Sequence, residues 1–286
     1  MRRIVWVVLV TIGAGLGLYP EAANWFNVRA QQSEIAAFHA AMGSLTESQT
    51  DEILARAEAH NALLARAEEH NVLIAAGHAT EDYYEQLRVE GSDVMAQINV
   101  PSIDLAIAVF HGVSHQVLDR AAGHHPATSL PVGGPDTHTV ITAHTGLPNA
   151  RLFNNLIDAR VEDLIIVRVP GRIMYYEVIR TEVVLAGDYH EHLEIEPGED
   201  LITLFTCTPY SVNTHRLLVT GRRIADPEAA GVADLIPDPI EAGFPTWAAL
   251  LSGAFLASIG SGRLIFGAAP KKESAAIHMP RHLRGN

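Results

Sequence analysis

Two uncharged apolar runs, one at each end of the chain, most constrain what this sequence can fold into. Residues 4–20 and 245–262 contain no charged side chain, and residues 264–270 extend the second run beyond Arg263. As a helix rising about 1.5 Å per residue, the first run spans about 25 Å, close to the roughly 30 Å hydrocarbon core of a bilayer. We therefore expect a membrane helix at each end, with Arg263 snorkelling to the interface.

The charges beside these runs predict how they are oriented. Between Glu21 and Phe244 lie 13 arginines, no lysine and 32 acidic residues, whereas the two ends carry seven basic residues against Glu273 alone. Because basic flanks stay inside, we expect both termini in the cytoplasm and the acidic middle outside the cell membrane. The formal net charge of -13 argues against a nucleic-acid partner, which requires a basic face. Two alternatives stay open: a cleaved signal peptide at the N-terminus, and an amphipathic or loosely packed C-terminal tail.

The segment after the first run reads as helix. Residues 31–76 are rich in alanine, lack proline and carry a near-repeat of ten residues around His60 and His70. Two repeats are too few for a solenoid, so we interpret the segment as an exposed helical stalk or hairpin with both histidines in solvent.

From residue 94 the sequence pattern changes to short runs of residues that are typical of β-strands. Glycine and proline separate these runs, and short helices are expected near residues 114–122 and 149–156. Many short strands with few helices indicate an antiparallel sandwich or a closed barrel. The expected strands cover residues 94–100, 103–110, 137–143, 163–169, 173–186, 201–206 and 216–223. The expected regions are an N-terminal membrane helix or signal anchor (1–20), a helical stalk or lid region (21–90), a β-domain (91–225), a linker (226–244), a C-terminal membrane helix (245–270) and a basic cytoplasmic tail (271–286).

Cys207 is the single cysteine, at the end of an apolar strand. An intramolecular disulfide and a cysteine-rich zinc site are therefore both excluded. A lone cysteine is more often a buried small hydrophobe than a nucleophile, but an unpaired thiol outside the cytoplasm is an oxidation liability that is easier to understand if the thiol is used. A free thiol is only a few per cent ionised at neutral pH, so a catalytic cysteine needs a basic or cationic neighbour.

Two residues have the right chemistry for that neighbour. His144 ends the strand 137–143, and Arg216 follows Cys207 by nine residues across a turn that contains proline. A hairpin would place the Arg216 guanidinium beside the end of the strand that carries Cys207, where it suits an oxyanion or a peptide carbonyl. From the residues alone, a histidine that caps a core strand and a surface arginine remain open alternatives.

Other histidine groups give only a weak metal signal. The pair at 124–125 and the pair at 190 and 192 each supply two ligands without a third. A protein zinc site uses at least three protein ligands, so we predict no metal and no cofactor.

The block around Cys207 resembles a known family. Thr203-Leu-Phe-Thr-Cys207 resembles the Thr-Leu-x-Thr-Cys signature of sortases. The longer run Thr206-Cys-Thr-Pro-Tyr-Ser-Val-Asn-Thr-His-Arg-Leu-Leu-Val219 is similar to the class C, pilus-assembling branch. So are Thr128-Ser-Leu-Pro-Val-Gly-Gly134, Ile195-Glu-Pro-Gly198 and Leu18-Tyr-Pro20. The resemblance extends from the first apolar run to the second.

This resemblance implies a fold and an activity. Sortases are membrane-anchored cysteine transpeptidases of Gram-positive cell surfaces, built on a closed eight-stranded β-barrel, and they cut a Leu-Pro-x-Thr-Gly-type sorting signal between Thr and Gly. By match, Cys207 is the nucleophile, His144 the acid/base and Arg216 the stabiliser of the substrate carbonyl, and we expect Thr206 and Thr208 to bind substrate. The partners implied are sorting-signal-bearing pilins or surface proteins, and an acceptor amine on a pilin lysine or a peptidoglycan peptide.

Three other readings stay open. The chain could be a wall-anchoring sortase, a different thiol hydrolase or a non-catalytic membrane-tethered scaffold. A papain-like hydrolase places its cysteine before its histidine, which is the reverse of the order here. One departure from class C is also visible: no Asp-Pro-aromatic lid lies between residues 21 and 94, and the nearest match is Asp82-Tyr83, which lacks the proline.

Overall fold

The chain divides into two compact units. The computed structural model describes residues 1–66, 82–210, 212–225, 227–228, 230–232, 235 and 242–267. One unit comprises Met1–Tyr19 and Thr246–Asn286, and the other comprises Pro20–Pro245. Helix α1 (Arg2–Gly43) contributes its N-terminal part to the first unit and the remainder to the second.

The first unit pairs the start of α1 with α5 (Thr246–Gly267). Trp6 Nε1 donates a hydrogen bond to Ser261 Oγ at 3.1 Å, and Arg3 Nη2 donates to the Phe266 carbonyl at 2.8 Å. Within the described residues, α1 and α5 are the two helices long and apolar enough to cross a membrane. Their length and composition suggest that the chain associates with a membrane.

The rest of α1 packs on one side of a β-barrel. Ile35 and Phe38 are fully buried against β1 (Val94–Val100) and β2 (Leu105–His111). Burial of one such side chain stabilises the fold by about 1.5–3 kcal/mol. Gln31 fixes the helix at this position, because its Oε1 accepts the Ala108 N–H at 3.0 Å and its Nε2 donates to the Arg120 carbonyl at 2.6 Å.

A break separates α1 from α2 (Glu47–Arg66), so the expected helical segment forms two helices within the described residues, as in the hairpin alternative, and not one continuous stalk. The helix ends at Gly43, and Thr46 with Gln49 forms a capping box for the next helix. The Thr46 N–H donates to Gln49 Oε1 at 2.9 Å, and the Gln49 N–H donates to Thr46 Oγ1 at 3.3 Å. These two bonds satisfy backbone donors that would otherwise lack partners at a new N-terminus. Residues 67–76 lie outside the described part of the chain.

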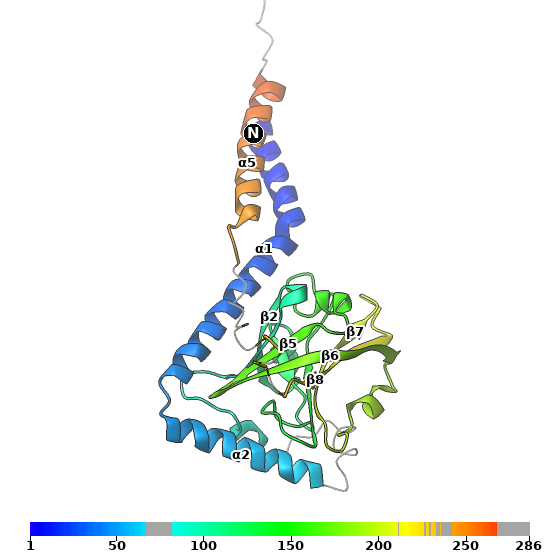
Figure 1. Cartoon of the computed structure of the whole chain (residues 1–286). Coiled ribbons are helices and arrows are strands. Elements are labelled where there is room, and N and C mark those ends of the chain that lie inside the picture. Colours follow the sequence, from blue (N-terminus) through cyan, green and yellow to red (C-terminus); the bar gives the residue numbers. More distant parts are fainter. Residues whose placement is uncertain are drawn as a thin grey trace, which may run out of the picture. The chain divides into compact units, whose positions relative to one another are not determined.

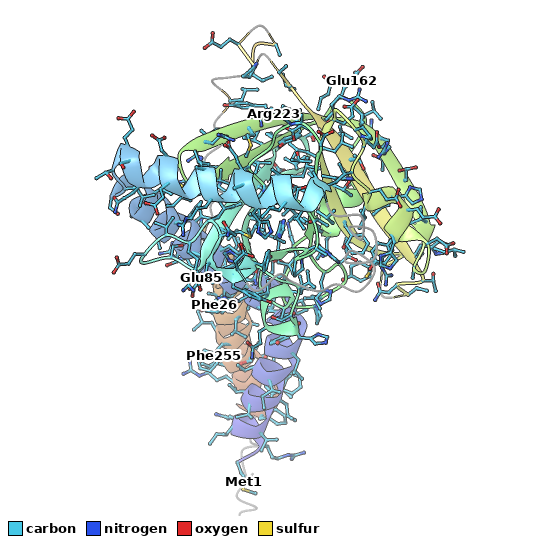
Figure 2. The ribbon with its side chains drawn as sticks, turned by 90° about the horizontal axis from the view of Figure 1, so that it is seen from below. Met1, Phe26, Glu85, Glu162, Arg223 and Phe255 are labelled. Atoms are coloured by element: carbon cyan, nitrogen blue, oxygen red, sulfur yellow. The ribbon has the colours of Figure 1, made fainter. Side chains whose placement is uncertain are left out.

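Helix α2 lies across the barrel rather than standing in solvent (Figures 1 and 2). Ile53 and Ala57 are buried in the main core, and the Asn61 side chain bonds both backbone groups of Leu130. His60 is 5% exposed, so the expectation that it is solvated is wrong, and His70 lies outside the described residues. The apolar face of α2 is therefore part of the domain core.

Eight strands close into a barrel in the order β1-β2-β3-β4-β7-β8-β6-β5, which confirms the expected fold class (Figure 1). The pairs β2–β3 and β4–β7 are parallel, so of the two expected architectures the structure has the closed barrel and not the antiparallel sandwich. A parallel pair needs a long crossover connection, and here that connection between β4 and β7 includes strands β5 and β6. The remaining strands are β3 (Ala122–His124), β4 (Thr137–Thr142), β5 (Leu164–Val169), β6 (Arg172–Leu185), β7 (Asp200–Thr208) and β8 (His215–Arg223).

The short elements depart most from expectation. The helix expected at 114–122 is the single-turn α4 (His115–Leu118), and strand β3 follows it. The helix expected at 149–156 is the 3-10 helix η3 (Asn154–Asp158). A Cβ at Gly123 would collide with the Gly112 carbonyl, so β3 needs a glycine where β2 and β3 approach closely, and the sequence there resembles a turn. Further 3-10 helices are η1 (Tyr83–Glu85), η2 (Pro101–Ile103) and η4 (Tyr189–Leu193).

Candidate active site

Strands β7 and β8 bring Cys207 and Arg216 together. They run antiparallel, and Cys207 is the direct register partner of Arg216. Directly opposed residues have Cβ atoms about 4.5–5.5 Å apart on the same face of a sheet. The nine-residue spacing of the sequence therefore corresponds to a hairpin with the thiol and the guanidinium as neighbours. Both side chains are partly exposed.

Strand β4 brings His144 to the other side of Cys207. It runs parallel to β7, with Thr142 paired to Phe205, and the Ala143 N–H donates to the Phe205 carbonyl at 3.4 Å. His144 lies two residues beyond the end of β4, next to Thr145, whose hydroxyl bonds the Cys207 carbonyl. Continuing the β4–β7 register by two residues would bring His144 opposite Cys207, on the side away from Arg216.

Two threonines fasten the backbone around His144 to the backbone around Cys207. Thr206 Oγ1 donates to the Ala143 carbonyl at 2.7 Å, and Thr145 Oγ1 donates to the Cys207 carbonyl at 2.7 Å. Each bond joins a neighbour of one catalytic candidate to the other strand. The spacing between His144 and Cys207 is therefore set by two hydrogen bonds in addition to the β-ladder.

Strand alternation places this site on the outer face of the barrel. Leu204 and Thr206 point inward and are buried, whereas Phe205 and Cys207 point outward. We call the apolar group on this outer face the outer-face cluster. It consists of Ala127, Val140, Leu193 and Leu218, with Val184, Tyr189 and Phe205 packed against it.

The two threonines expected to bind substrate differ in burial. Thr206 is 2% exposed and its hydroxyl donates to the Ala143 carbonyl, which gives it a structural role; substrate binding by Thr206 and Thr208 stays a prediction. Thr208 ends β7 opposite His215 and is half-buried. Sequence reasoning missed Thr145, and its position immediately after His144 was the available signal.

Arg216 is anchored through one nitrogen only. Its Nη1 donates to the carbonyls of Asn213 and His215, each at 3.0 Å. Within the described part of the chain, its Nη2 and Nε have no protein partner, and no side-chain hydrogen bond links Cys207, His144 and Arg216. The guanidinium is therefore held in place with donors left over for a bound group.

The connection between β6 and β7 borders the same face. Within η4, the Tyr189 ring stacks on Phe205 with ring centroids 4.9 Å apart and an interplanar angle of 29°. Burial raises the pKa of Tyr189, and the positive charge of Arg216 opposes that shift. Sequence reasoning missed Tyr189, because no local pattern links residues 189 and 216.

The nearest match to a lid motif is a core element. Tyr83 is fully buried, and its hydroxyl accepts the Gly112 N–H at 2.9 Å and bonds His124 Nδ1 at 2.9 Å. Its ring also stacks on the His124 ring, with centroids 5.6 Å apart. Tyr83 therefore supports the barrel interior and is not an exposed plug.

The remaining histidine groups serve structure. His124 Nε2 hydrogen-bonds the Ser129 carbonyl at 2.9 Å, and burial lowers the pKa of His124 to about 3. His192 faces Glu182 at 3.4 Å on the barrel surface. No group of three or more His, Cys, Asp or Glu that could hold a metal ion occurs in the described residues.

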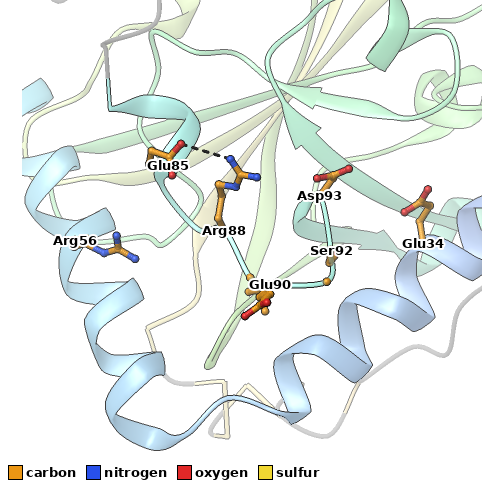
Figure 3. Close-up of a pocket in the computed structure, with 9 residues that line it drawn as sticks. Glu34, Arg56, Glu85, Arg88, Glu90, Ser92 and Asp93 are labelled. Carbon is orange, nitrogen blue, oxygen red and sulfur yellow. Dashed lines mark hydrogen bonds and ion pairs between the residues drawn. The ribbon is translucent and has the colours of Figure 1, made fainter.

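A separate pocket of about 550 Å³ is lined by Glu34 of α1, Arg56 of α2, Glu85 and residues 88–93 (Figure 3). None of Cys207, His144 and Arg216 is among the residues that line it. The dashed line in Figure 3 joins Arg88 to Glu85, an ion pair of 3.5 Å. Because both side chains are exposed, this pair contributes little to the stability of the fold. The pocket is lined mainly by charged side chains and contains neither a cysteine nor a histidine.

Comparison with known proteins agrees with this geometry. The model of the sortase domain matches residues 98–224. Sortase C1 of the group B Streptococcus pilus island 1 is 34% identical, with a TM-score of 0.63 over 73% of this chain and 97% of that chain. Sortase C-1 from Streptococcus pneumoniae is 37% identical, with a TM-score of 0.60 over 68% of this chain and 99% of that chain.

A third relative and one negative result complete the comparison. Sortase C1 of Streptococcus agalactiae, solved in complex with MTSET, is 38% identical, with a TM-score of 0.58 over 66% of this chain and 96% of that chain. No curated protein sequence matches the chain. A shared barrel, a sequence identity above 30% over nearly the full length of these relatives and the Cys207 site point to one family: the chain belongs to the sortases, cysteine transpeptidases, and its structural neighbours are class C pilin sortases.

Proposed function

We propose that the protein cleaves a Leu-Pro-x-Thr-Gly-type sorting signal between Thr and Gly and transfers the new acyl group to the lysine amine of a pilin. The observation that supports this proposal is the pairing of Cys207 with Arg216 across β7 and β8, with His144 two residues beyond the end of the neighbouring strand β4. A nucleophile, a proton carrier and a fixed cation in one row are what thioester chemistry on a peptide bond needs. The pilin names of the structural neighbours favour the pilus branch.

The reaction follows from the residues in two steps. In the first, the Cys207 thiolate attacks the Thr carbonyl carbon, the C–N bond to Gly breaks, and protonated His144 gives its proton to the leaving amine. In the second, an incoming amine attacks the thioester, loses its proton to His144 and releases the thiolate. The free Nη2 and Nε donors of Arg216 would bind the carbonyl oxygen as negative charge builds on it.

The test is intact-mass spectrometry of the full-length protein in detergent micelles, mixed with a Leu-Pro-x-Thr-Gly peptide and then with a lysine-bearing pilin fragment. We expect a Thr-acyl adduct on Cys207 that moves to the fragment. The only lysines of the chain are Lys271 and Lys272, which simplifies the assignment of any acylated lysine. Cys207→Ala, with unchanged thermal stability, is expected to form no adduct.

Other outcomes would select another activity. An adduct that moves only to a peptidoglycan-type amine would indicate a wall-anchoring sortase. An adduct that is lost equally to water with and without amines would indicate a thiol hydrolase. Full function of a Cys207→Ser variant in cells would contradict catalysis and favour a scaffold.

The proposed location is the cell membrane, with the barrel outside and both termini in the cytoplasm. The basic residues at the two ends and the acidic middle support this orientation. Because Cys207 is the single cysteine and is partly exposed, a membrane-impermeant maleimide should label the protein in intact cells. Labelling that requires cell lysis, with Cys207→Ala as the unlabelled control, would contradict the orientation.

A further inference from the structure

Helix η4 holds an aromatic side chain beside the Cys207–Arg216 pair. Leu193, at the end of η4, is fully buried in the outer-face cluster with Val140 and Leu218. At its start, the Tyr189 ring is stacked on Phe205. The helix is thus fixed to the barrel at both ends, which gives the Tyr189 ring a defined position.

That position is one step along the strand from the reacting residues. Phe205 precedes Cys207 by two residues on the same face, and its register partner Leu218 follows Arg216 by two. Two residues of a strand span about 6.6 Å. The positive charge of Arg216 also opposes the effect of burial on the pKa of the Tyr189 phenol.

The Tyr189 hydroxyl is unused by the protein. It makes no hydrogen bond to any described residue, and the side chain is about half-buried. Because burial raises its pKa, the phenol stays protonated at neutral pH and can donate. Nη2 and Nε of Arg216 likewise donate no hydrogen bond to any described residue. Three donors without protein partners therefore lie on the surface that a bond attacked by Cys207 would occupy.

We propose that Tyr189 is a second hydrogen-bond donor, beside Arg216, to the carbonyl oxygen of the bond that Cys207 attacks. This inference rests on the proposed function, which places that carbonyl over the outer face. Charge builds on the carbonyl oxygen only as the tetrahedral intermediate forms. A donor aimed at it therefore accelerates the chemical step more than it tightens substrate binding.

The decisive variant is Tyr189→Phe, which keeps the ring and its stack on Phe205 and removes the hydroxyl alone. We expect kcat for cleavage of a Leu-Pro-x-Thr-Gly peptide by the full-length protein in detergent micelles to fall about 10- to 100-fold, with KM changed less than twofold. The matched control is Tyr210→Phe, because Tyr210 is 60% exposed in the turn after β7. It should leave kcat within twofold.

The outcomes separate this inference from the function it rests on. A thermal midpoint of Tyr189→Phe equal to that of the wild type would show that the stack and fold survive. A kcat within twofold of the wild type, or an effect confined to KM, would overturn the role of Tyr189. If Arg216→Lys and Cys207→Ala, assayed in parallel, also keep full activity, the proposed catalytic site itself fails. If only Tyr189→Phe keeps full activity, the proposed roles of Cys207 and Arg216 are retained and the role of Tyr189 is rejected.

Discussion

At the scale of single residues, two threonine hydroxyls determine how closely His144 approaches Cys207. Thr206 faces the barrel interior and Thr145 lies at its rim, yet each donates across from one strand to the other. A threonine before the cysteine reads from sequence as an ordinary β-strand residue or a substrate contact. Its buried side chain shows instead that it holds the carbonyl immediately before His144.

Thr206→Val should destabilise the protein by about 1–3 kcal/mol, because the isosteric change leaves the buried Ala143 carbonyl without its partner. Urea denaturation of the full-length protein would measure the loss. Thr208→Val is the matched control, since Thr208 is half-buried and no hydrogen bond of its side chain is recorded in the described residues; we expect a change below about 0.5 kcal/mol there. Equal stability of Thr206→Val and the wild type would rule out this structural role.

At the scale of elements, α2 is joined to the barrel by the Asn61 side chain, which hydrogen-bonds the Leu130 backbone as a neighbouring strand would. Asn61 Nδ2 donates to the Leu130 carbonyl at 3.0 Å, and its Oδ1 accepts the Leu130 N–H at 2.7 Å. Leu130 is fully buried in the connection between β3 and β4, where its carbonyl also accepts the Val132 N–H and the Thr139 hydroxyl. The helix thereby supplies the acceptor for the buried Leu130 N–H and a further donor to its carbonyl.

Asn61→Leu should cost about 1–3 kcal/mol, because the buried Leu130 N–H loses its acceptor while the Leu130 carbonyl keeps the Val132 N–H and the Thr139 hydroxyl. The unfolding free energy and the hydrogen-exchange rate of the Leu130 amide would report the loss. Arg56→Ala, on the exposed side of the same helix, should change neither quantity. A protected Leu130 amide in Asn61→Leu would contradict the proposed joint.

At the scale of the whole molecule, buried neutral histidines make folding sensitive to acid. Burial lowers the pKa of His124 to about 3 and that of His125 to about 4, from an ordinary value of 6.5. Below pH 6.5 these two histidines bind protons in the unfolded chain but stay neutral in the folded chain. The stabilisation is therefore complete above pH 6.5 and is lost as the pH falls towards 4.

We expect the unfolding free energy to fall between pH 7 and pH 5, with a slope of up to about 1.4 kcal/mol per pH unit for each buried histidine. Chemical denaturation across this range measures the slope. His125→Gln should flatten it, whereas His115→Gln should not, because His115 is exposed. A slope that His125→Gln leaves unchanged would remove His125 as a cause.

The sequence by itself determined what depends on local patterns. The two apolar runs, most of the strands and the hairpin spacing of Cys207 and Arg216 follow from side-chain periodicity, charge and turn residues within short windows. Their physical causes act between neighbours along the chain. The family resemblance also rested on a contiguous block, Thr203-Leu-Phe-Thr-Cys207.

Tertiary structure decided what depends on contacts between distant segments. The parallel pairing of β4 with β7 brings the segment that carries His144 next to the strand that carries Cys207, and no periodicity in either strand encodes it. The same holds for Tyr189 over Phe205 and for Asn61 beneath Leu130, where one side chain meets a partner far along the chain. Such contacts form only when the barrel closes. Closure of the barrel brings distant segments into contact, and the local propensities of those segments do not specify the partner.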